Sequence, residues 1–176
     1  MRRAALGDII DSATGLAAVG TTTQYHELGS IYVQEESSGS SVDGTDSQGP
    51  REWIYIKNGE ASTAMALGEV IMRKASDITY VCQRATTTAP PAMLVGIAQS
   101  AIAAGSYGWI MRKGMSKVLA DGTLTANTPV KTSTSVAANA TSDNLTQTAM
   151  AWGHNLGVDP GVAITAAAQI RINFQG

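Results

Sequence analysis

Short segments of alternating apolar and polar residues, separated by turn signals, are the feature of this sequence that most restricts its fold. The pattern begins at residues 53–57 (WIYIK), which read as a strand followed by the tight-turn signal Asn58-Gly59. Further strand-like segments follow at residues 70–73, 79–83, 93–99, 107–112, 116–119, 130–132, 149–156 and 168–174. Such spacing predicts an all-β fold, a compact β-sandwich or β-barrel of short antiparallel strands.

The chain divides into three parts. Residues 1–36 are predicted to form an extended N-terminal arm, with a short helix at residues 6–13 and a short strand at residues 31–33. Residues 37–50 (SSGSSVDGTDSQGP) are rich in Gly, Ser and Asp, which is typical of a flexible loop. Residues 51–176 are predicted to be the β domain, with residues 136–147 as an Ala/Ser/Thr/Asn-rich loop inside it.

The composition narrows the function classes. Charged residues are only 15% of the chain, and the net charge of −2 argues against nucleic acid as a partner. No apolar stretch approaches the roughly 20 residues of a membrane-spanning helix. Cys82 is the single cysteine, so an intramolecular disulfide and a Cys-based metal cage are excluded, and we expect it to be a small buried residue on a strand.

Candidate catalytic, metal-binding and cofactor-binding residues are few. His26 and His154 lie far apart in the chain, with no carboxylate at metal or triad spacing, and no known catalytic motif occurs. We interpret His154 as a strand or interface residue. Asp43 and Asp46 lack the ligand spacing of a calcium loop, so we expect a solvated turn there. The sequence therefore predicts no catalytic residue, no metal site and no cofactor.

Three tryptophans and a few interleaved basic residues allow two interpretations. Trp53, Trp109 and Trp152 could form a platform for sugars or bases, but their neighbours at period two favour core residues or interface anchors. The nearest approach to a basic stripe is Arg51, Lys57, Arg112 and Lys113. Without a basic cluster, this stripe does not predict nucleic-acid binding.

The middle and the end of the chain show a weak internal sequence similarity. Residues 93–114 and 150–176 each read as strand, glycine-containing turn, strand and terminal glycine. This pattern predicts two similar hairpins that face one core, although it falls short of a solenoid repeat.

Several of these segments together resemble a known family. The stretches EVIMRK (69–74), VGIAQ (95–99), AGSYGWIMRKG (104–114) and TPV (128–130), with Val118 and Leu124, are similar to phage capsid decoration (cement) proteins. In those families a strand ending in Gly-Asp/Glu-Val-Val is followed by Val-Gly-Val-Ala, a glycine-containing turn and a strand ending in Arg/Lys-Gly. The resemblance covers roughly residues 53–176, and the first 50 residues lie outside it.

The resemblance implies a structural, non-enzymatic protein of the virion. Its β domain would be a homo-oligomer, with a trimer favoured, bound to the capsid exterior, where it would bridge neighbouring major capsid protein subunits after synthesis in the host cytoplasm. We expect the partner-binding residues to be Leu6, Ile9, Ile10 and Leu16 of the arm, with Trp109 and Trp152.

Three alternatives stay open at this point. The first is another virion component, namely a head–tail connector, a tail subunit or a head-fibre subunit. The second is a carbohydrate-binding or adhesion module, which the three tryptophans suggest. The third is a small hydrolase that uses His154.

Overall fold

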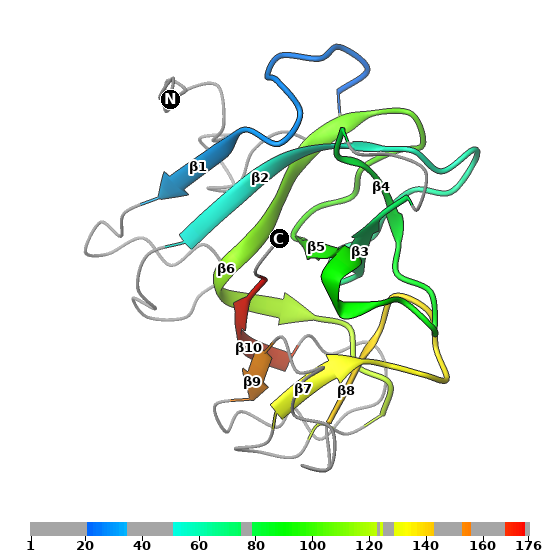
Figure 1. Ribbon diagram of the computed structural model, residues 1–176, viewed down its shortest axis with the longest axis vertical. Helices are drawn as coiled ribbons and strands as arrows, with labels where there is room; N and C mark the ends of the chain where they lie inside the picture. Colours follow the sequence, from blue (N-terminus) through cyan, green and yellow to red (C-terminus); the bar gives the residue numbers. More distant parts are fainter. Residues whose placement is uncertain are drawn as a thin grey trace.

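The computed structural model describes residues 21–34, 51–74, 79–122, 124, 129–142, 153–155 and 168–174. The chain is 47% strand and 3% helical, and it contains a closed five-stranded β-barrel, which confirms the predicted all-β class. The described strands are β1 (Ile31–Gln34), β2 (Arg51–Asn58), β3 (Val70–Arg73), β4 (Val81–Arg84), β5 (Leu94–Ala98), β6 (Tyr107–Val118), β7 (Pro129–Thr132), β8 (Ala140–Ser142), β9 (Gly153–Asn155) and β10 (Ala168–Asn173). Figure 1 shows their arrangement.

The barrel consists of β2, β4, β3, β5 and β6, in that order around its wall. It closes because β6 pairs with β2 along most of its first half, for example Ile54 opposite Ile110. Within the barrel, β2 and β4 run parallel, with Lys57 opposite Val81, whereas the other neighbours run antiparallel. The barrel is therefore antiparallel as predicted except at this one junction.

The parallel junction arises because Asn58-Gly59 does not close a two-residue hairpin. The strand that follows, β3, pairs with β4 and β5 instead of β2. The buried side-chain amide of Asn58 donates hydrogen bonds to the carbonyl oxygens of Thr63, at 3.0 Å, and Ile102, at 2.8 Å. Because these bonds hold the chain after β2 against the segment before β6, the next strand begins further along the sequence.

A cluster of nine buried side chains fills the barrel. Every barrel strand contributes at least one member, and two more come from the connecting segments: Ile54, Ile56, Met65, Ile71, Cys82, Val95, Ala98, Ile102 and Ile110. Since side chains alternate across a strand, a cluster drawn from all five strands occupies the interior. Cys82 lies in it at 0% exposure, which confirms the prediction of a small buried strand residue.

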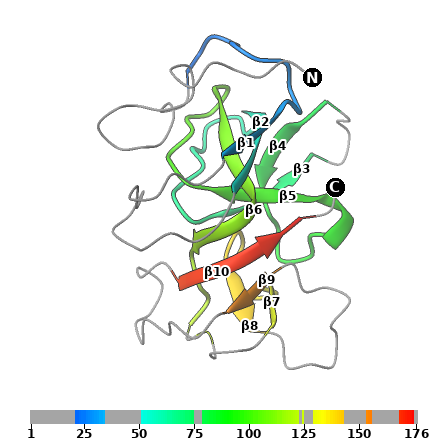
Figure 2. The same ribbon diagram turned by 90° about the vertical axis from the view of Figure 1, so that its left-hand side faces the viewer.

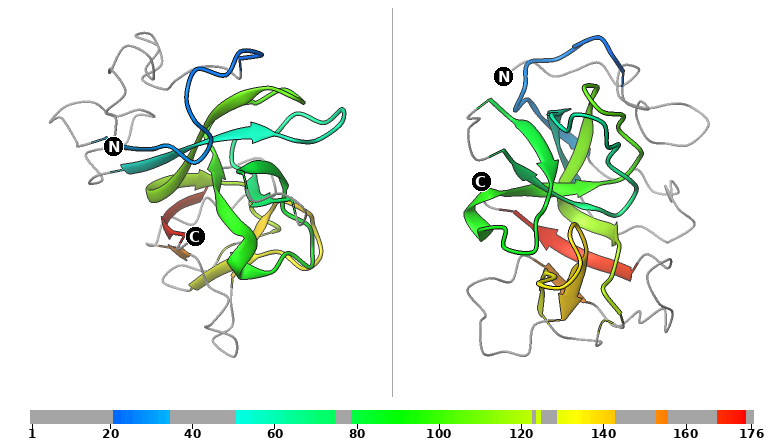
Figure 3. Two further views of the ribbon diagram at one scale, coloured as in Figure 1. Left: turned by 45° about the horizontal axis from the view of Figure 1, so that its top comes forward. Right: turned by 90° about the vertical axis from the view of Figure 1, so that its right-hand side faces the viewer.

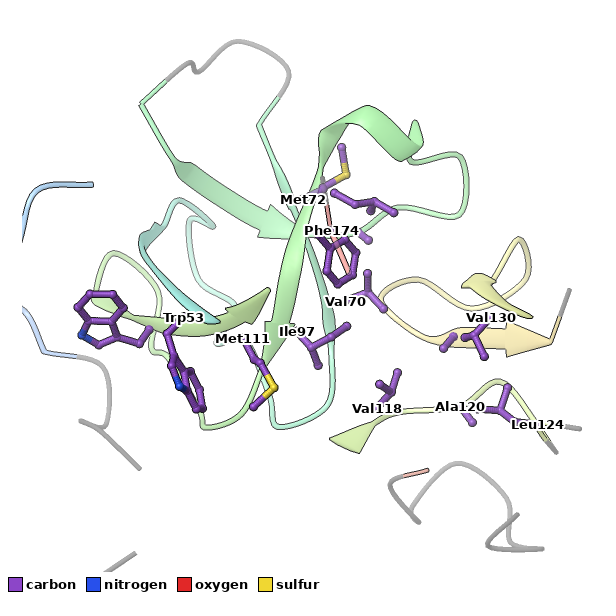
Figure 4. Packing of buried hydrophobic residues seen from close by; sticks show 14 of the residues in the cluster. Trp53, Val70, Met72, Ile97, Met111, Val118, Ala120, Leu124, Val130 and Phe174 are labelled. Atoms are coloured by element: carbon purple, nitrogen blue, oxygen red, sulfur yellow. The ribbon is translucent and has the colours of Figure 1, made fainter. Parts of the chain in front are cut away.

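The outward-facing side chains of the same strands form a second, longer core. It runs as a continuous band from Trp53 on β2, through Met111 and Phe174, to Val130 on β7 (Figure 4). Its far half includes Val130 of β7, Ala140 of β8 and Phe174, which follows β10. The strands β7 to β10 lie below the barrel in Figure 1 and in the right-hand view of Figure 3. The barrel and this extension therefore share one core, and one continuous sheet links them.

The long strand β6 connects the two halves. Its first part pairs with β2 and β5, and its second part pairs with β10, which lies beside it in Figure 2. Gly114 lies at this change of partner, with φ of +114°, a conformation that side chains with a Cβ rarely adopt. The glycine thus allows β6 to leave the barrel and continue as one strand, where the sequence predicted two strands at residues 107–112 and 116–119.

The predicted loop at residues 136–147 is wrong in part, because β8 lies inside it and pairs with β7. Ala138, Asn139 and Ala140 are buried in front of and within β8. The small side chain of Ala138 lets the backbone approach the barrel closely, so that Val70 N–H donates to the Ala138 carbonyl and Ala138 N–H donates to the Ala85 carbonyl, both at 2.8 Å. Small residues carry little periodic hydrophobic signal, which is why the pattern missed this strand.

The strand pairing of both predicted hairpins is confirmed, because β5 pairs with β6 and β9 pairs with β10. The predicted strand at residues 31–33 is confirmed as β1, which adds to β2. The short helix at residues 6–13 and the loop at residues 37–50 lie outside the described residues. Within the described part of the chain, no helix is long and apolar enough to cross a membrane.

Candidate functional site

Residues 21–34, which we call the strap, cross the outer face of β2 and β6 (blue in Figure 1). At one end Thr21 and Tyr107 exchange two backbone hydrogen bonds, of 3.0 and 2.9 Å. In the middle, Gly29 N–H donates to the Tyr55 carbonyl at 2.8 Å, and Tyr55 N–H donates to the Ser30 carbonyl at 3.0 Å. At the other end the strap continues as β1, so it is fastened along its whole described length.

An aromatic cluster joins the strap to the barrel, with His26 and Tyr32 from the strap and Tyr55, Tyr107 and Trp109 from the barrel. The imidazole ring of His26 stands edge-on to Tyr55 and to Trp109, with ring centroids 5.1 Å apart in both pairs. Tyr55 also stacks on Tyr107 at 6.3 Å with the planes 12° apart, and Tyr32 stands edge-on to Trp109 at 6.4 Å. Edge-on and stacked pairs at these distances are the favoured arrangements of aromatic rings.

The cluster is apolar inside and polar at its margins. Burial raises the pKa of the Tyr32 hydroxyl above its ordinary value, because the charged form would lose solvation. The Tyr55 hydroxyl accepts a hydrogen bond from Tyr25 N–H at 3.2 Å, and the ammonium group of Lys57 lies 5.4 Å from the centre of the Tyr107 ring. The arrangement is suited to holding a segment of chain rigidly against the barrel.

The predicted partner-binding residues meet different outcomes. Trp109 is only 4% exposed and lies in the aromatic cluster, so within the single chain it is a core residue. Its contact with a partner stays a prediction. Its place at period two with Tyr107 turns both rings toward the strap. The other five, namely Leu6, Ile9, Ile10, Leu16 and Trp152, lie outside the described residues.

The basic residues that suggested a stripe have local roles in the barrel. Lys57 stacks over Tyr107, whereas Arg112 and Lys113 both pair with the Glu52 carboxylate, at 3.6 and 3.4 Å. Arg51 is buried at 8% exposure. These side chains therefore do not form one exposed basic face.

Another ion pair ties the residue before β3 to β4. The carboxylate of Glu69, which is 5% exposed, accepts from Nε of Arg84 at 2.8 Å and from its Nη2 at 2.7 Å. Its other oxygen accepts from Ala66 N–H at 2.8 Å. With both oxygens bonded, this buried carboxylate holds the start of β3 in place.

The remaining candidate groups are separated in the fold. His154 lies on β9, opposite Arg171 of β10 and Pro129 of β7. Gly105 lies in the turn before β6 with φ of +75°, as expected for a turn glycine. Among the residues that the structure describes, no three His, Cys, Asp or Glu side chains are grouped closely enough to hold a metal ion.

Comparison with known proteins gives no relative: no family model matches the chain, and no curated protein matches it significantly.

The strap and its aromatic contacts were not predicted from the sequence. Two signals were present: Trp53 and Tyr55 are two residues apart on β2, and so are Tyr107 and Trp109 on β6. Both pairs therefore point to one face of each strand. What no pattern indicated is that His26 lies on that face, because the strap is irregular and distant in sequence from both strands.

Proposed function

We propose that this protein is a structural subunit that acts by binding other protein subunits, and specifically that it decorates the outside of a phage capsid. In this role it contacts the major capsid protein, bridges neighbouring capsid subunits and forms a homo-oligomer, with a trimer favoured. It is made in the host cytoplasm and resides on the virion exterior.

The first support is where the family-like segments lie. Residues 69–74, 95–99 and 104–114 supply β3, β5 and most of the wall formed by β6. Two glycines in these segments allow close contacts: a Cβ on Gly96 would lie 2.4 Å from the Met111 carbonyl oxygen, and one on Gly108 would lie 2.9 Å from the Ile102 side chain. The resemblance therefore coincides with positions that the barrel itself requires.

The main support for the proposal is the attachment of the strap to the barrel wall. The strap fastens Thr21 to β6 and Gly29 to β2, so residues 1–20 are joined to the barrel at a fixed point of its wall. A clamp between capsid subunits must transmit load from its contacts to a rigid body. The filled barrel supplies that body, and the strap connects it to the apolar residues Leu6, Ile9, Ile10 and Leu16.

The structure weakens one alternative. Trp53 and Trp109 are 2% and 4% exposed, so two of the three tryptophans that suggested a sugar-binding platform lie in the core. The barrel and strap suit other virion components equally well, such as a connector, tail or head-fibre subunit. Measuring the number of copies per particle would distinguish these components from a decoration protein.

The test is co-sedimentation of the purified protein with undecorated mature shells, with the mass of the free protein measured in parallel. We expect binding in many copies per shell and a trimer in solution. Deletion of residues 1–20 should abolish binding and leave the barrel folded. Failure of the intact protein to sediment with shells would overturn the capsid proposal, and undiminished binding of the truncated protein would overturn the role of the arm.

A matched variant separates arm length from arm chemistry. Changing Leu6, Ile9, Ile10 and Leu16 to Ser keeps the length of residues 1–20 and removes the apolar anchors. We expect this variant to bind as poorly as the deletion. Binding equal to that of the unmodified protein would show that these four side chains are not the anchors.

A further inference from the structure

A small pocket on the barrel, which adjoins the strap at Tyr80, brings two arginines together. Its lining comes from β2, β3, β5, β6 and the residue before β4: Ile54, Arg73, Tyr80, Leu94, Val95 and Arg112. We call it the arginine pocket. Its floor includes Ile54 and Val95, which belong to the interior cluster of the barrel. The pocket has room for a single water-sized group.

Arg73 is the unsatisfied member of the arginine pocket. Its guanidinium carbon lies 4.9 Å from the centre of the Tyr80 ring, so the group is held over an aromatic face. Its Nε is buried, and no acceptor reaches it among the residues that the structure describes. A buried charged donor without an acceptor is unfavourable, and a bound acceptor would remove that penalty.

Arg112 lies on the other side of the pocket and is only partly neutralised. Its side chain is 13% exposed, its Nε lies 3.6 Å from a Glu52 carboxylate oxygen, and its Nη2 donates to the Phe174 carbonyl at 3.1 Å. The same Glu52 oxygen also lies 3.4 Å from Nζ of Lys113. Because one carboxylate serves two cations, the side chains of Arg73, Arg112, Lys113 and Glu52 together carry a net positive charge.

We propose that the arginine pocket is a binding site for a carboxylate group. A guanidinium presents its donors in a plane that matches a planar carboxylate. The apolar walls of Ile54, Leu94 and Val95 lower the local dielectric constant and strengthen the attraction. The space admits one water-sized group, so it would receive a single oxygen of the carboxylate.

The carboxylate comes either from an acidic side chain of a partner protein or from a small free carboxylic acid. The site stands on the geometry of Arg73 and Arg112 and does not depend on the proposed capsid role. If that role is correct, the partner source places an acidic residue of the capsid protein against β3 and β6.

The test uses the full-length protein and acetate as the probe, at low ionic strength so that screening is weak. Acetate is titrated while the Nε–Hε NMR signal of Arg73 is followed. We expect this signal to shift saturably, with inorganic phosphate binding more weakly. Arg73→Gln should weaken acetate binding about tenfold or more, and Glu52→Gln should strengthen it several-fold by freeing Arg112.

Lys57→Gln is the matched control, because it removes another cation that stacks on a tyrosine, Tyr107, away from the pocket. It should leave acetate binding unchanged, and a folded NMR spectrum of each variant shows that the barrel is intact. The proposal is overturned if acetate leaves the Arg73 signal unmoved, or if Arg73→Gln and Lys57→Gln reduce binding equally.

A second measurement identifies the source of the carboxylate. Shell co-sedimentation is repeated with Arg73→Gln and with excess acetate. If both treatments reduce shell binding, the pocket receives an acidic side chain of the shell. If acetate binds to the pocket but neither treatment affects shell binding, the natural occupant is a free carboxylic acid. A failure of the capsid proposal itself would leave the acetate titration unaffected.

Discussion

The imidazole ring of His26 lies edge-on to the indole ring of Trp109, with the ring centroids 5.1 Å apart. The same imidazole ring stands edge-on to Tyr55 at an equal distance. One side chain of the strap therefore contacts the outer faces of both β2 and β6, the two strands whose pairing closes the barrel. Nε2 of this ring is buried without a partner among the described residues, so the contact depends on ring packing and not on a hydrogen bond from that nitrogen.

Replacing His26 with Ala should loosen the strap and leave the barrel folded. Each aromatic pair is worth about 0.5–1.5 kcal/mol beyond its buried area, so the loss of two pairs should lower the free energy of unfolding by about 1–3 kcal/mol. Urea unfolding measures this loss, and hydrogen exchange should show faster opening of the Gly29 N–H, which bonds to the Tyr55 carbonyl. His26→Phe keeps a ring and should stay close to the original stability; equal losses in both variants would refute the ring-packing explanation.

Gly29 and Gly105 form a matched pair for a steric prediction. Both have positive φ, of +84° and +75°, but a Cβ on Gly29 would lie 2.6 Å from two ring carbons of Tyr80, whereas one on Gly105 would meet nothing within 4 Å. Gly105→Ala should therefore cost only the backbone strain, about 1–2 kcal/mol. Gly29→Ala should cost about 1–3 kcal/mol more, because Tyr80 must move. Urea midpoints measure both, and equal losses would contradict the predicted clash.

Replacing Asn58 with Ala or with Asp should lower the free energy of unfolding. Its fully buried amide donates to the carbonyl oxygens of Thr63 and Ile102, and its own oxygen accepts from Glu60 N–H at 3.0 Å. Asn58→Ala leaves these groups without their partner and should cost at least about 2 kcal/mol. Asn58→Asp at pH 7 should cost more, because a carboxylate would face two carbonyl oxygens. Unfolding at pH 7 and at lower pH distinguishes them: the Asp variant should recover stability as its carboxyl protonates, and the Ala variant should not.

The raised pKa of the Tyr32 hydroxyl predicts a loss of protein stability at alkaline pH. Burial raises the pKa of this hydroxyl in the folded protein above the ordinary value of 10.0. Above pH 10.0 the unfolded chain therefore releases a proton that the folded chain keeps. The contribution of Tyr32 to stability is fully present below the pKa of the unfolded chain, and it is lost as the pH rises through the pKa of the folded protein. Tyr32→Phe should reduce this fall. Parallel pH–stability curves for the two proteins above that pH would refute the prediction.

Much of the barrel could be predicted from local patterns, because its strands carry their own signals. The segments at residues 53–57, 70–73, 93–99 and 107–112 alternate or run apolar between turn residues, and each became a barrel strand. The strand at 140–142 was missed because Ala138 and Ala140 are buried by close backbone approach and not by large apolar side chains. Hydrophobic periodicity indicates a strand when bulky apolar side chains recur on one face, and it gives no signal for small residues that are buried by close backbone contact.

The candidate sites could be predicted far less well than the strands. The burial of Trp109 could not be predicted from its own strand, since burial depends on which segment covers the strand. Arg73 and Arg112 lie in strand segments that the pattern identified correctly, yet nothing local indicates that they line one pocket. Their proximity results from closure of the barrel.

The sequence by itself determined the all-β class, the positions of most barrel strands and the burial of Cys82, because side-chain alternation and turn residues act over a few neighbouring residues. Only the tertiary structure decided that β4 inserts beside β2 in parallel, that β6 serves both halves, and that the strap places His26 against Tyr55 and Trp109. These features depend on contacts between residues that are distant in the chain. Such contacts are selected by the packing free energy of the whole core, which no short segment encodes alone.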